Sequence, residues 1–392
     1  MKKIIISILL VFTGLSATAQ SGYDVVLQQI ETNSITLAAL RKQTDAQQLG
    51  NRTGIYLANP EVEYNYLWGN PSLIGNRTDI SVKQSFDFPT AYAYRGKIAN
   101  LQNVNAGLAY KAERLNILLS AKRICIELIY YNALAKEYAV RLQNAIHLAE
   151  AYQSKLIAGE TNALENNKAQ LNLATMQTEA ARNEVARNAL FAELKILNGG
   201  KDINFPDEDY PVRILPANFE EWYTQAEAKS PALQYVSGQI EIERQQVKLN
   251  SAMGLPKFSA GYMSEKVVGQ HFQGITAGVS IPLWENKNRV RQAKAQVQAT
   301  EYALEDTKMQ FYNRLQMLYQ KAAALQQNAQ TARQSLSSYS NEPLLKKALE
   351  AGEISLLNYL LEIEFHYDII NKALEAEHDF ELTAAELQAV EL

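Results

Sequence analysis

Four histidines are the side chains in this sequence best suited to catalysis or metal binding. They are His147, His271, His366 and His378. Glu362 and His366 lie four residues apart, so on a helix they would share one face and could form part of a metal site. Two ligands without a third do not make such a site, and His271 falls in an expected surface loop. The common nucleophile, phosphate-loop, dinucleotide and zinc-protease motifs are also missing, so the sequence predicts neither an enzyme nor a bound cofactor or metal.

Composition and the N-terminus limit the classes of protein to which this chain could belong. A formal net charge of −4 at pH 7 offers no basic stripe for nucleic acid. The basic start, the apolar run after it and Ala17-Thr18-Ala19 are typical of a signal peptide over residues 1–19, with a buried strand as the alternative. The single cysteine, Cys125, lies in a helical apolar repeat, which favours a small core residue over a reactive thiol. We therefore expect an exported protein without an internal disulfide.

Two stretches, residues 60–88 and 256–283, each contain a pair of short segments in which polar and apolar residues alternate. This spacing is typical of β-strands, so each stretch predicts a hairpin. A hairpin that packs on a soluble core would alternate in the same way. The apolar side is rich in aromatic residues, and each segment is long enough to cross a bilayer at a tilt, so we expect this side to face lipid. The residues expected to face lipid are Val62, Tyr64, Tyr66, Trp68, Ile80, Val82, Phe86, Phe258, Tyr262, Ile275, Val279 and Ile281.

Each hairpin is followed by a long pair of helical segments that a glycine divides. Residues 97–197 form the first pair around Gly159, and residues 286–392 form the second around Gly352. Both pairs carry apolar residues at the three- and four-residue steps of packed helices. The order helix, hairpin, long helix, glycine turn and long helix thus occurs twice, as in a tandem duplication. The expected organisation is a first repeat at 20–200, a proline-rich connector at 201–217 and a second repeat at 218–392.

Four strands are too few to close a membrane barrel within one chain. Single-chain barrels begin at about eight strands, and an open sheet edge would leave backbone groups unsatisfied in hydrocarbon. If the strands enter a membrane, several copies must share one barrel, and three copies would supply about twelve strands. The long helices would then pack between copies as a tube. The sequence therefore predicts a mainly α-helical chain with a pair of β-hairpins, which forms a hollow assembly.

Three motifs resemble those of the TolC family of outer-membrane efflux channels. One is VSIPLW at residues 279–284, followed by Arg289, and the others are the turns at residues 156–160 and 349–353. Within the family, the chain is most similar to the CusC/CzcC-like members of cation-efflux systems. The resemblance implies a homotrimer in the outer membrane of a Gram-negative bacterium, with a shared twelve-stranded barrel in the lipid and an α-helical tunnel in the periplasm. It also implies a passive conduit, opened by a periplasmic adaptor protein and powered by an inner-membrane pump of the RND type.

The resemblance further implies roles for residues near the two glycine turns. The positions that would contact the adaptor are Gly159, Glu160, Gly352 and Glu353. Family members often narrow the tunnel with acidic residues, and here the corresponding positions hold Glu165, Asn358 and Leu361, with Glu362 beside the last. We expect a weak constriction led by Glu165, with Asn358 and Glu362 from the second repeat. Alternatively, the glycines only end helices, and Glu165 is a solvated residue of the first helical turn.

A secreted periplasmic coiled-coil adaptor or scaffold without channel activity is the alternative interpretation of the whole chain. It would explain the signal peptide and the helical pairs, but not two aromatic-rich hairpins at matched positions. The cargo stays open between metal cations and other small molecules, because the sequence holds no cluster of Met, His and Cys. Any metal specificity would then belong to the pump.

Overall fold

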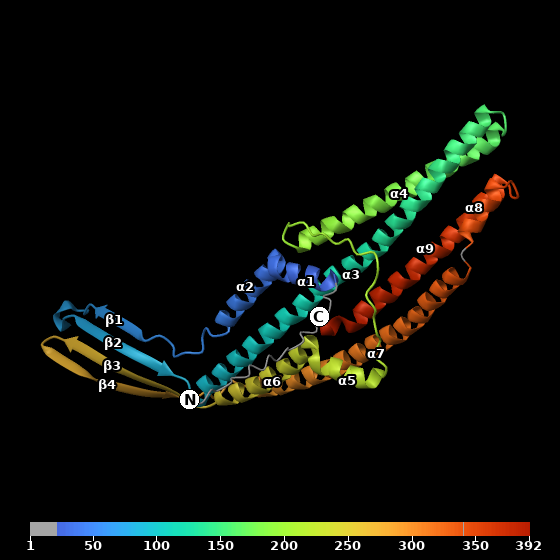
Figure 1. Cartoon of the computed structure of the whole chain (residues 1–392). Coiled ribbons are helices and arrows are strands. Elements are labelled where there is room, and N and C mark those ends of the chain that lie inside the picture. Colours follow the sequence, from blue (N-terminus) through green and yellow to red (C-terminus); the bar gives the residue numbers. More distant parts are fainter. Residues whose placement is uncertain (1–21, 340) are drawn as a thin grey trace, which may run out of the picture. The chain divides into compact units, whose positions relative to one another are not determined.

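The computed structural model describes residues 22–339 and 341–392, so the signal peptide expected at residues 1–19 lies outside the described part. Within it, long helices alternate with short connections, and four strands form one sheet (Figure 1). The helices are α1 Gly22–Asn33, α2 Ile35–Gly50, α3 Pro89–Ile157, α4 Ala163–Leu197, α5 Phe219–Lys229, α6 Pro231–Ala252, α7 Arg289–Ser338, α8 Glu342–Glu350 and α9 Leu356–Leu387. The strands are β1 Glu61–Leu67, β2 Arg77–Phe86, β3 Lys257–Val267 and β4 Gln270–Ser280, and the short 3-10 turns are η1 Ser72–Ile74 and η2 Gln388–Glu391.

Side-chain caps explain where several helices begin. The Asn162 side chain accepts the backbone N–H of Glu165 at the start of α4, and the Ser230 hydroxyl accepts that of Leu233 at the start of α6. Pro231 occupies the first turn of α6, where its missing N–H would have had no helical partner. These polar caps satisfy backbone donors that would otherwise be left open at each helix start.

None of the described helices has the combination of length and apolar sequence that would let it cross a bilayer.

Two helical stretches, residues 22–50 and 289–350, are each divided in the structure. The first breaks at Ser34, between α1 and α2, where Asn33 donates its side-chain N–H to the amide oxygen of Asn198 at 3.0 Å. Asn and Ser favour such side-chain contacts over helical continuation. The second divides after Ser338, where α7 ends, and α8 begins at Glu342. A sequence reading that places the interruption at Pro343 itself is therefore a few residues late. Pro343 instead lies in the first turn of α8, a position that tolerates its missing N–H.

The chain divides into two compact units, and each takes segments from both halves of the sequence. The first unit comprises the chain up to Ser34, residues 120–213 and residues 329–381. The second comprises residues 35–119, 214–328 and 382–392. Three long helices, α3, α7 and α9, contribute one part to each unit. The first unit contains the glycine turns, and the second contains the sheet.

The core of the first unit is built where the connector after α4 lies on α3. Asn132 of α3 donates its side-chain N–H to the carbonyl oxygens of Phe205 and Asp207, at 3.2 and 2.9 Å, and its own oxygen accepts a bond from Arg187. This lone strongly polar residue of the helical repeat is therefore buried with its polar atoms paired. Cys125 is also buried, as expected for a core residue, and desolvation raises the pKa of its thiol to about 12.

The core of the second unit contains a cluster of aromatic rings. Phe219 of α5 contacts the rings of Tyr223, Tyr312 and Tyr319, with centroids 5.4 to 5.9 Å apart. Leu387, at the end of α9, is fully buried in the same cluster. Such ring pairs contribute beyond the apolar area that they bury, so they fix α5 against α7.

Candidate functional site

The four strands form one antiparallel sheet in the order β1-β2-β3-β4 (Figure 1). The two hairpins are joined through β2 and β3, which pair from Arg77 opposite Val267 to Phe86 opposite Phe258. β1 and β4 lie at the edges, and in the described part of the chain each has a single neighbouring strand. An exposed strand edge carries unpaired backbone N–H and C=O groups, so it can pair with another chain.

One face of this sheet is apolar and uncovered. Its central row runs across all four strands as Val62, Val82, Tyr262 and Ile275. The same face carries Tyr64, Tyr66, Ile80, Phe86, Phe258 and Val279. The described chain leaves this face uncovered, since most of its large side chains are exposed and Ile275 is 89% exposed. A contiguous apolar face of this kind needs a partner or lipid to cover it.

The opposite face of the sheet is mainly charged or lined by small residues, although Phe272 and Met263 interrupt it. Glu61 lies across from Lys83, and Asp79 lies across from Glu265. Small side chains face this way from the second half of β4; they belong to Gly274, Thr276, Gly278 and Ser280. The two faces thus differ as the lipid and water sides of a membrane strand differ.

Exposed aromatic residues lie at both ends of the sheet. We call the end where β1 joins β2 and β3 joins β4 the turn end, and the other the helix end. Trp68 follows β1 at the turn end and meets the Tyr66 ring edge-on, with centroids 5.7 Å apart. Tyr56, before β1, and Ile281 and Trp284, after β4, lie at the helix end and are also exposed. Trp and Tyr are typical of the two interfaces that border a bilayer.

The two glycine turns have the same backbone geometry. Gly159 and Gly352 both have a φ of 74°, the left-handed conformation that favours glycine. The N–H of Glu160 donates to the carbonyl of Lys155 at 2.8 Å, and that of Glu353 donates to Ala348 at 2.9 Å. These bonds span six residues and close each helix in the manner of a Schellman motif. A Cβ atom at either glycine would meet no other atom within 4 Å, so both turns have open surroundings.

The candidate constriction residues lie just after these turns, in the first two turns of α4 and α9. The N–H of Glu165 donates to the Asn162 side chain, and the N–H of Asn358 donates to the Ser355 hydroxyl, so the two positions are equivalent. The Glu165 carboxylate is 2.8 Å from the ammonium of Lys168 and only partly exposed. Asn358 and Glu362 of α9 are exposed.

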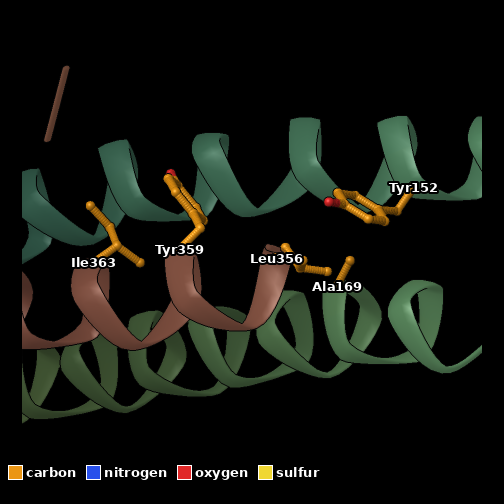
Figure 2. Close-up of a cluster of buried hydrophobic side chains, with 5 residues drawn as sticks. All are labelled: Tyr152, Ala169, Leu356, Tyr359 and Ile363. Carbon is orange, nitrogen blue, oxygen red and sulfur yellow. The ribbon is translucent and has the colours of Figure 1, made fainter. Parts of the chain in front are cut away.

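A buried cluster behind the turns holds α3, α4 and α9 together. Its members are Tyr152 of α3, Ala169 of α4 and Leu356, Tyr359 and Ile363 of α9. Figure 2 shows Tyr359 and Ile363 extending from α9 toward α3, with Leu356 beside Ala169. Side chains of α8 pack against the cluster from Leu345 and Leu349. The positions of both glycine turns are therefore set by one shared core.

The histidine geometry differs from the sequence expectation in two places. His366 lies with its Nε2 4.0 Å from a carboxylate oxygen of Glu342 on α8. His271 is part of β4 instead of a loop, because the turn before it contains only Val268 and Gly269. Its Nε2 is 2.8 Å from the Ser264 hydroxyl. Within residues 22–339 and 341–392, no group of three His, Cys, Asp or Glu residues is placed to hold a metal ion.

Solved structures with the same fold span nearly the whole chain. The structure of CusC matches with a TM-score of 0.77 at 12% identity, covering 95% of this chain and 92% of CusC. The outer membrane protein VceC from Vibrio cholerae matches with a TM-score of 0.76 at 14% identity, covering 94% of this chain and 95% of VceC. The Campylobacter jejuni CmeC outer membrane channel matches at 0.74, with 15% identity, over 94% of this chain and 85% of CmeC.

The sequence comparison agrees with the fold. The family model for outer membrane efflux proteins matches residues 222–360. Part of this chain therefore matches the outer membrane efflux protein family, and its fold is similar to those of the solved channels CusC and CmeC. These similarities support a place in the outer membrane, and they agree with the family that the VSIPLW segment and the paired turns predict.

A curated relative matches part of this chain. Over 242 residues it is 26% identical to the alkaline protease secretion protein AprF of Pseudomonas aeruginosa, covering 57% of this chain and 50% of AprF. The match therefore spans about half the length of that relative.

Sequence reasoning missed the buried arginine of α3. The helical repeat predicts Leu142 inside, but the structure buries Arg141, whose guanidinium lies 4.4 Å from the centre of the Tyr367 ring. The buried side of α3 changes along the helix, from the side of Leu118 and Cys125 to the side of Arg141 and Ala145. No signal in the spacing alone could have located this change.

Sequence reasoning also missed an exposed, uncharged seam on α4. It repeats every seven residues and consists of Leu164, Leu171, Thr178, Val185 and Ala192, all exposed. Its middle is a shallow, open surface bordered by side chains of α4 such as Ala174, Ala181 and Arg182. The seven-residue spacing could have been found in the sequence, but only the structure shows that this seam has no partner in the described chain.

Proposed function

We propose that this chain is the outer-membrane channel of a tripartite efflux system, a passive conduit built from three copies. A periplasmic adaptor protein would open it, and an inner-membrane pump of the RND type would supply the energy. The family match and the shared fold support the assignment at the level of an outer-membrane efflux channel.

The observation that carries the proposal is the sheet with two open edges and one uncovered apolar face. β2, β3 and β4 contain 10, 11 and 11 residues, which is the length of a strand that crosses a bilayer at a tilt. Backbone groups at an open edge cannot remain unpaired in hydrocarbon. Pairing of β1 in one copy with β4 in the next would remove both edges, and three copies would give a closed barrel of about twelve strands.

The α4 seam supports self-association in the helical part. A helix face that met only water would carry charges along its length. The seam residues from Leu164 to Ala192 are uncharged, and they keep the spacing of a helix that packs against another. The exposed apolar residues Leu357, Leu361 and Phe365 of α9 form a second face of the same unit that needs a partner. We propose that such faces pack between copies of this chain.

The two glycine turns are the proposed contacts for the adaptor, through Gly159, Glu160, Gly352 and Glu353. Their matched geometry and open surroundings support equivalent contacts in both repeats. Glu165, Asn358 and Glu362 would line a constriction nearby. Since Glu165 is paired with Lys168, and Asn358 is neutral, we propose a constriction that is only weakly acidic.

The proposed cargo is small molecules or metal cations. The name of the curated relative refers to secretion of a protease, so protein export is the second candidate. An export assay in cells that lack this chain would compare a metal panel, a drug panel and a secreted protease. Loss of resistance to metals or drugs supports efflux, whereas loss of the extracellular protease alone assigns the chain to protein secretion.

The experiment that tests the channel is fractionation of cells, followed by chemical cross-linking and planar-bilayer recording of the purified mature protein. We expect cross-linked trimers from the outer-membrane fraction that give small, defined and cation-biased conductance steps. Recovery of a soluble monomer from the periplasm would refute the channel and would leave a secreted coiled-coil scaffold as the interpretation.

A further inference from the structure

The polar face of the sheet carries an ion cluster at the turn end that the proposed function does not explain. Arg77, the first residue of β2, has its Nε 2.9 Å from Oδ1 of Asp79 and 3.1 Å from Oε1 of Glu265 on β3. The Asp79 side chain is only 9% exposed, whereas that of Glu265 is 29% exposed. One guanidinium is thus shared between two carboxylates.

A third carboxylate lies on the same face nearby. Glu63 of β1 accepts a bond from Asn65 at 3.0 Å, and Asn65 lies directly across from Asp79. Three carboxylates and one guanidinium therefore face the same side at the turn end. The helix end of this face differs, because Lys83 lies across from Glu61 and Lys257 lies 3.6 Å from the carboxylate of Glu285. The charges balance there, whereas carboxylates are in excess toward the turn end.

We infer that Arg77, Asp79, Glu265 and Glu63 form a charge filter that makes the turn end of the conduit favour cations over anions. Arg77 determines the strength of this preference, because it neutralises part of the carboxylate charge. The inference rests on the proposed channel, in which the polar face borders the water-filled path. Charges of one sign on the wall of a narrow path surrounded by low dielectric raise the local concentration of ions of the opposite sign.

Cross-strand stabilisation alone would not require this cluster. β2 and β3 already pair over ten residues, and an exposed cross-strand ion pair adds only about 0.2–1 kcal/mol. The cluster also holds three carboxylates for one guanidinium, whereas a purely structural ion pair would need only one carboxylate. A role in ion preference explains this excess of carboxylates over positive charges.

The chain offers a matched control for Arg77. Lys266 lies one residue from Glu265 on β3, so its side chain projects to the apolar face, still close to the turn end. Arg77→Gln and Lys266→Gln each remove one positive charge at the same end of the sheet, from opposite faces. Only the first would alter the potential in the water-filled path.

The test is the reversal potential of single trimers in a planar bilayer under a potassium chloride gradient. We expect Arg77→Gln to raise the ratio of cation to anion permeability roughly twofold or more, as the Coulomb energy of one charge across a few ångströms of water implies. Glu265→Gln should lower the ratio by a similar factor, and Lys266→Gln should leave it unchanged. Arg77→Lys keeps the charge without the shared geometry, so it should retain the wild-type ratio.

Different failures separate this inference from the proposed function. If wild-type protein forms no conducting trimer, the proposed function fails. Conducting trimers whose ratio is unchanged in Arg77→Gln and Glu265→Gln would overturn the filter alone. An equal rise in Arg77→Gln and Lys266→Gln would also overturn it, because the face assignment would be wrong. If Arg77→Lys and Arg77→Gln lowered trimer yield equally without changing the ratio, the cluster would be only a structural link between β2 and β3.

Discussion

At the scale of single residues, the glycine turns show how one backbone angle decides what a position tolerates. Gly352 has a φ of 74°, whereas Gly107 lies inside α3, and a Cβ at either position would meet no atom within 4 Å. Space is therefore equal at the two sites, and only the backbone conformation differs. The same substitution should have effects of opposite sign.

We expect Gly352→Ala to destabilise the turn by about 1–2 kcal/mol, because a side chain in the left-handed region is strained. Gly107→Ala should instead stabilise α3 by about 0.5–1 kcal/mol, since it lowers the entropy lost on helix formation. Hydrogen exchange at the α8–α9 turn and thermal unfolding followed by circular dichroism would measure the two effects. A destabilising Gly107→Ala would contradict this explanation.

A buried ion pair in the first unit predicts a dependence of stability on pH. Arg213 of the connector lies 2.7 Å from Glu381 of α9, and their side chains are 10% and 4% exposed. Burial raises the pKa of Glu381 above its usual value, although Arg213 opposes this shift. A carboxyl with a raised pKa contributes stability that is complete below the unfolded-state pKa, about 4.3, and is lost as the pH rises through the folded-state pKa.

Arg213→Met should lower the free energy of unfolding by about 3–5 kcal/mol near neutral pH, because it leaves the Glu381 charge buried without its partner. It should also raise the pKa of Glu381 further, so the difference from wild type narrows as the pH falls toward about 4. The measurement is thermal unfolding in detergent across this pH range. Arg182→Met is the control, since Arg182 is 73% exposed in its pair with Glu179 and should change stability by less than about 1 kcal/mol.

At the scale of elements, α4 has two faces suited to packing against other helices. Only one of them is covered in the described chain. One face contributes Ala169, Asn183, Leu190 and Leu194 to the core of the first unit. The other is the uncharged seam, whose residues are exposed. α4 therefore needs a contact from another molecule to bury the apolar residues of its seam.

We expect Val185→Glu to weaken self-association at least tenfold without unfolding the chain. Val185 is exposed in the single copy, whereas an association that covers the seam would bury an unpaired carboxylate there at a cost of several kcal/mol. Thr175→Glu places the same charge at an exposed position of α4 outside the seam and should keep the wild-type oligomer. Cross-linking and native mass spectrometry would compare them. Equal trimer fractions in both variants would exclude the seam as an interface.

At the scale of the whole molecule, two similar turns lie on one shared core. The helix caps at Asn162 and Ser355 and the left-handed glycines occur in the same order in each repeat. The acidic residues that follow the glycines, Glu160 and Glu353, are both exposed. An adaptor that recognises one turn would thus find nearly the same surface on the other.

We expect the double variant Glu160→Lys and Glu353→Lys to reduce export severalfold while trimer yield and bilayer conductance stay unchanged, because reversing these charges places like charges at a contact that complementary charges favour. Glu193→Lys, an exposed charge reversal at the far end of α4, is the matched control. Export in cells and adaptor cross-linking would be measured together. Normal export by the double variant would show that the turns are not the adaptor contact.

Much of the architecture could be predicted from local sequence patterns. Alternation with a period of two marked both hairpins, and Gly159 and Gly352 marked the ends of the long helices. The parity of each strand also predicted which side chains share a face, so the apolar set from Val62 to Val279 lies together as expected. These features depend on bond geometry and nearest neighbours along the chain, which the sequence specifies directly.

Other features required the tertiary structure because they join residues far apart in the chain. The pairing of β2 with β3 brings Arg77 beside Glu265, and the spacing within either hairpin carries no information on this contact. The burial of Arg141 depends on the packing of α9 against that part of α3, where Tyr367 covers its guanidinium. The sequence alone therefore determined the elements, their faces and their turns, whereas only packing decided which faces are covered, which charges meet and which surfaces remain open for other molecules.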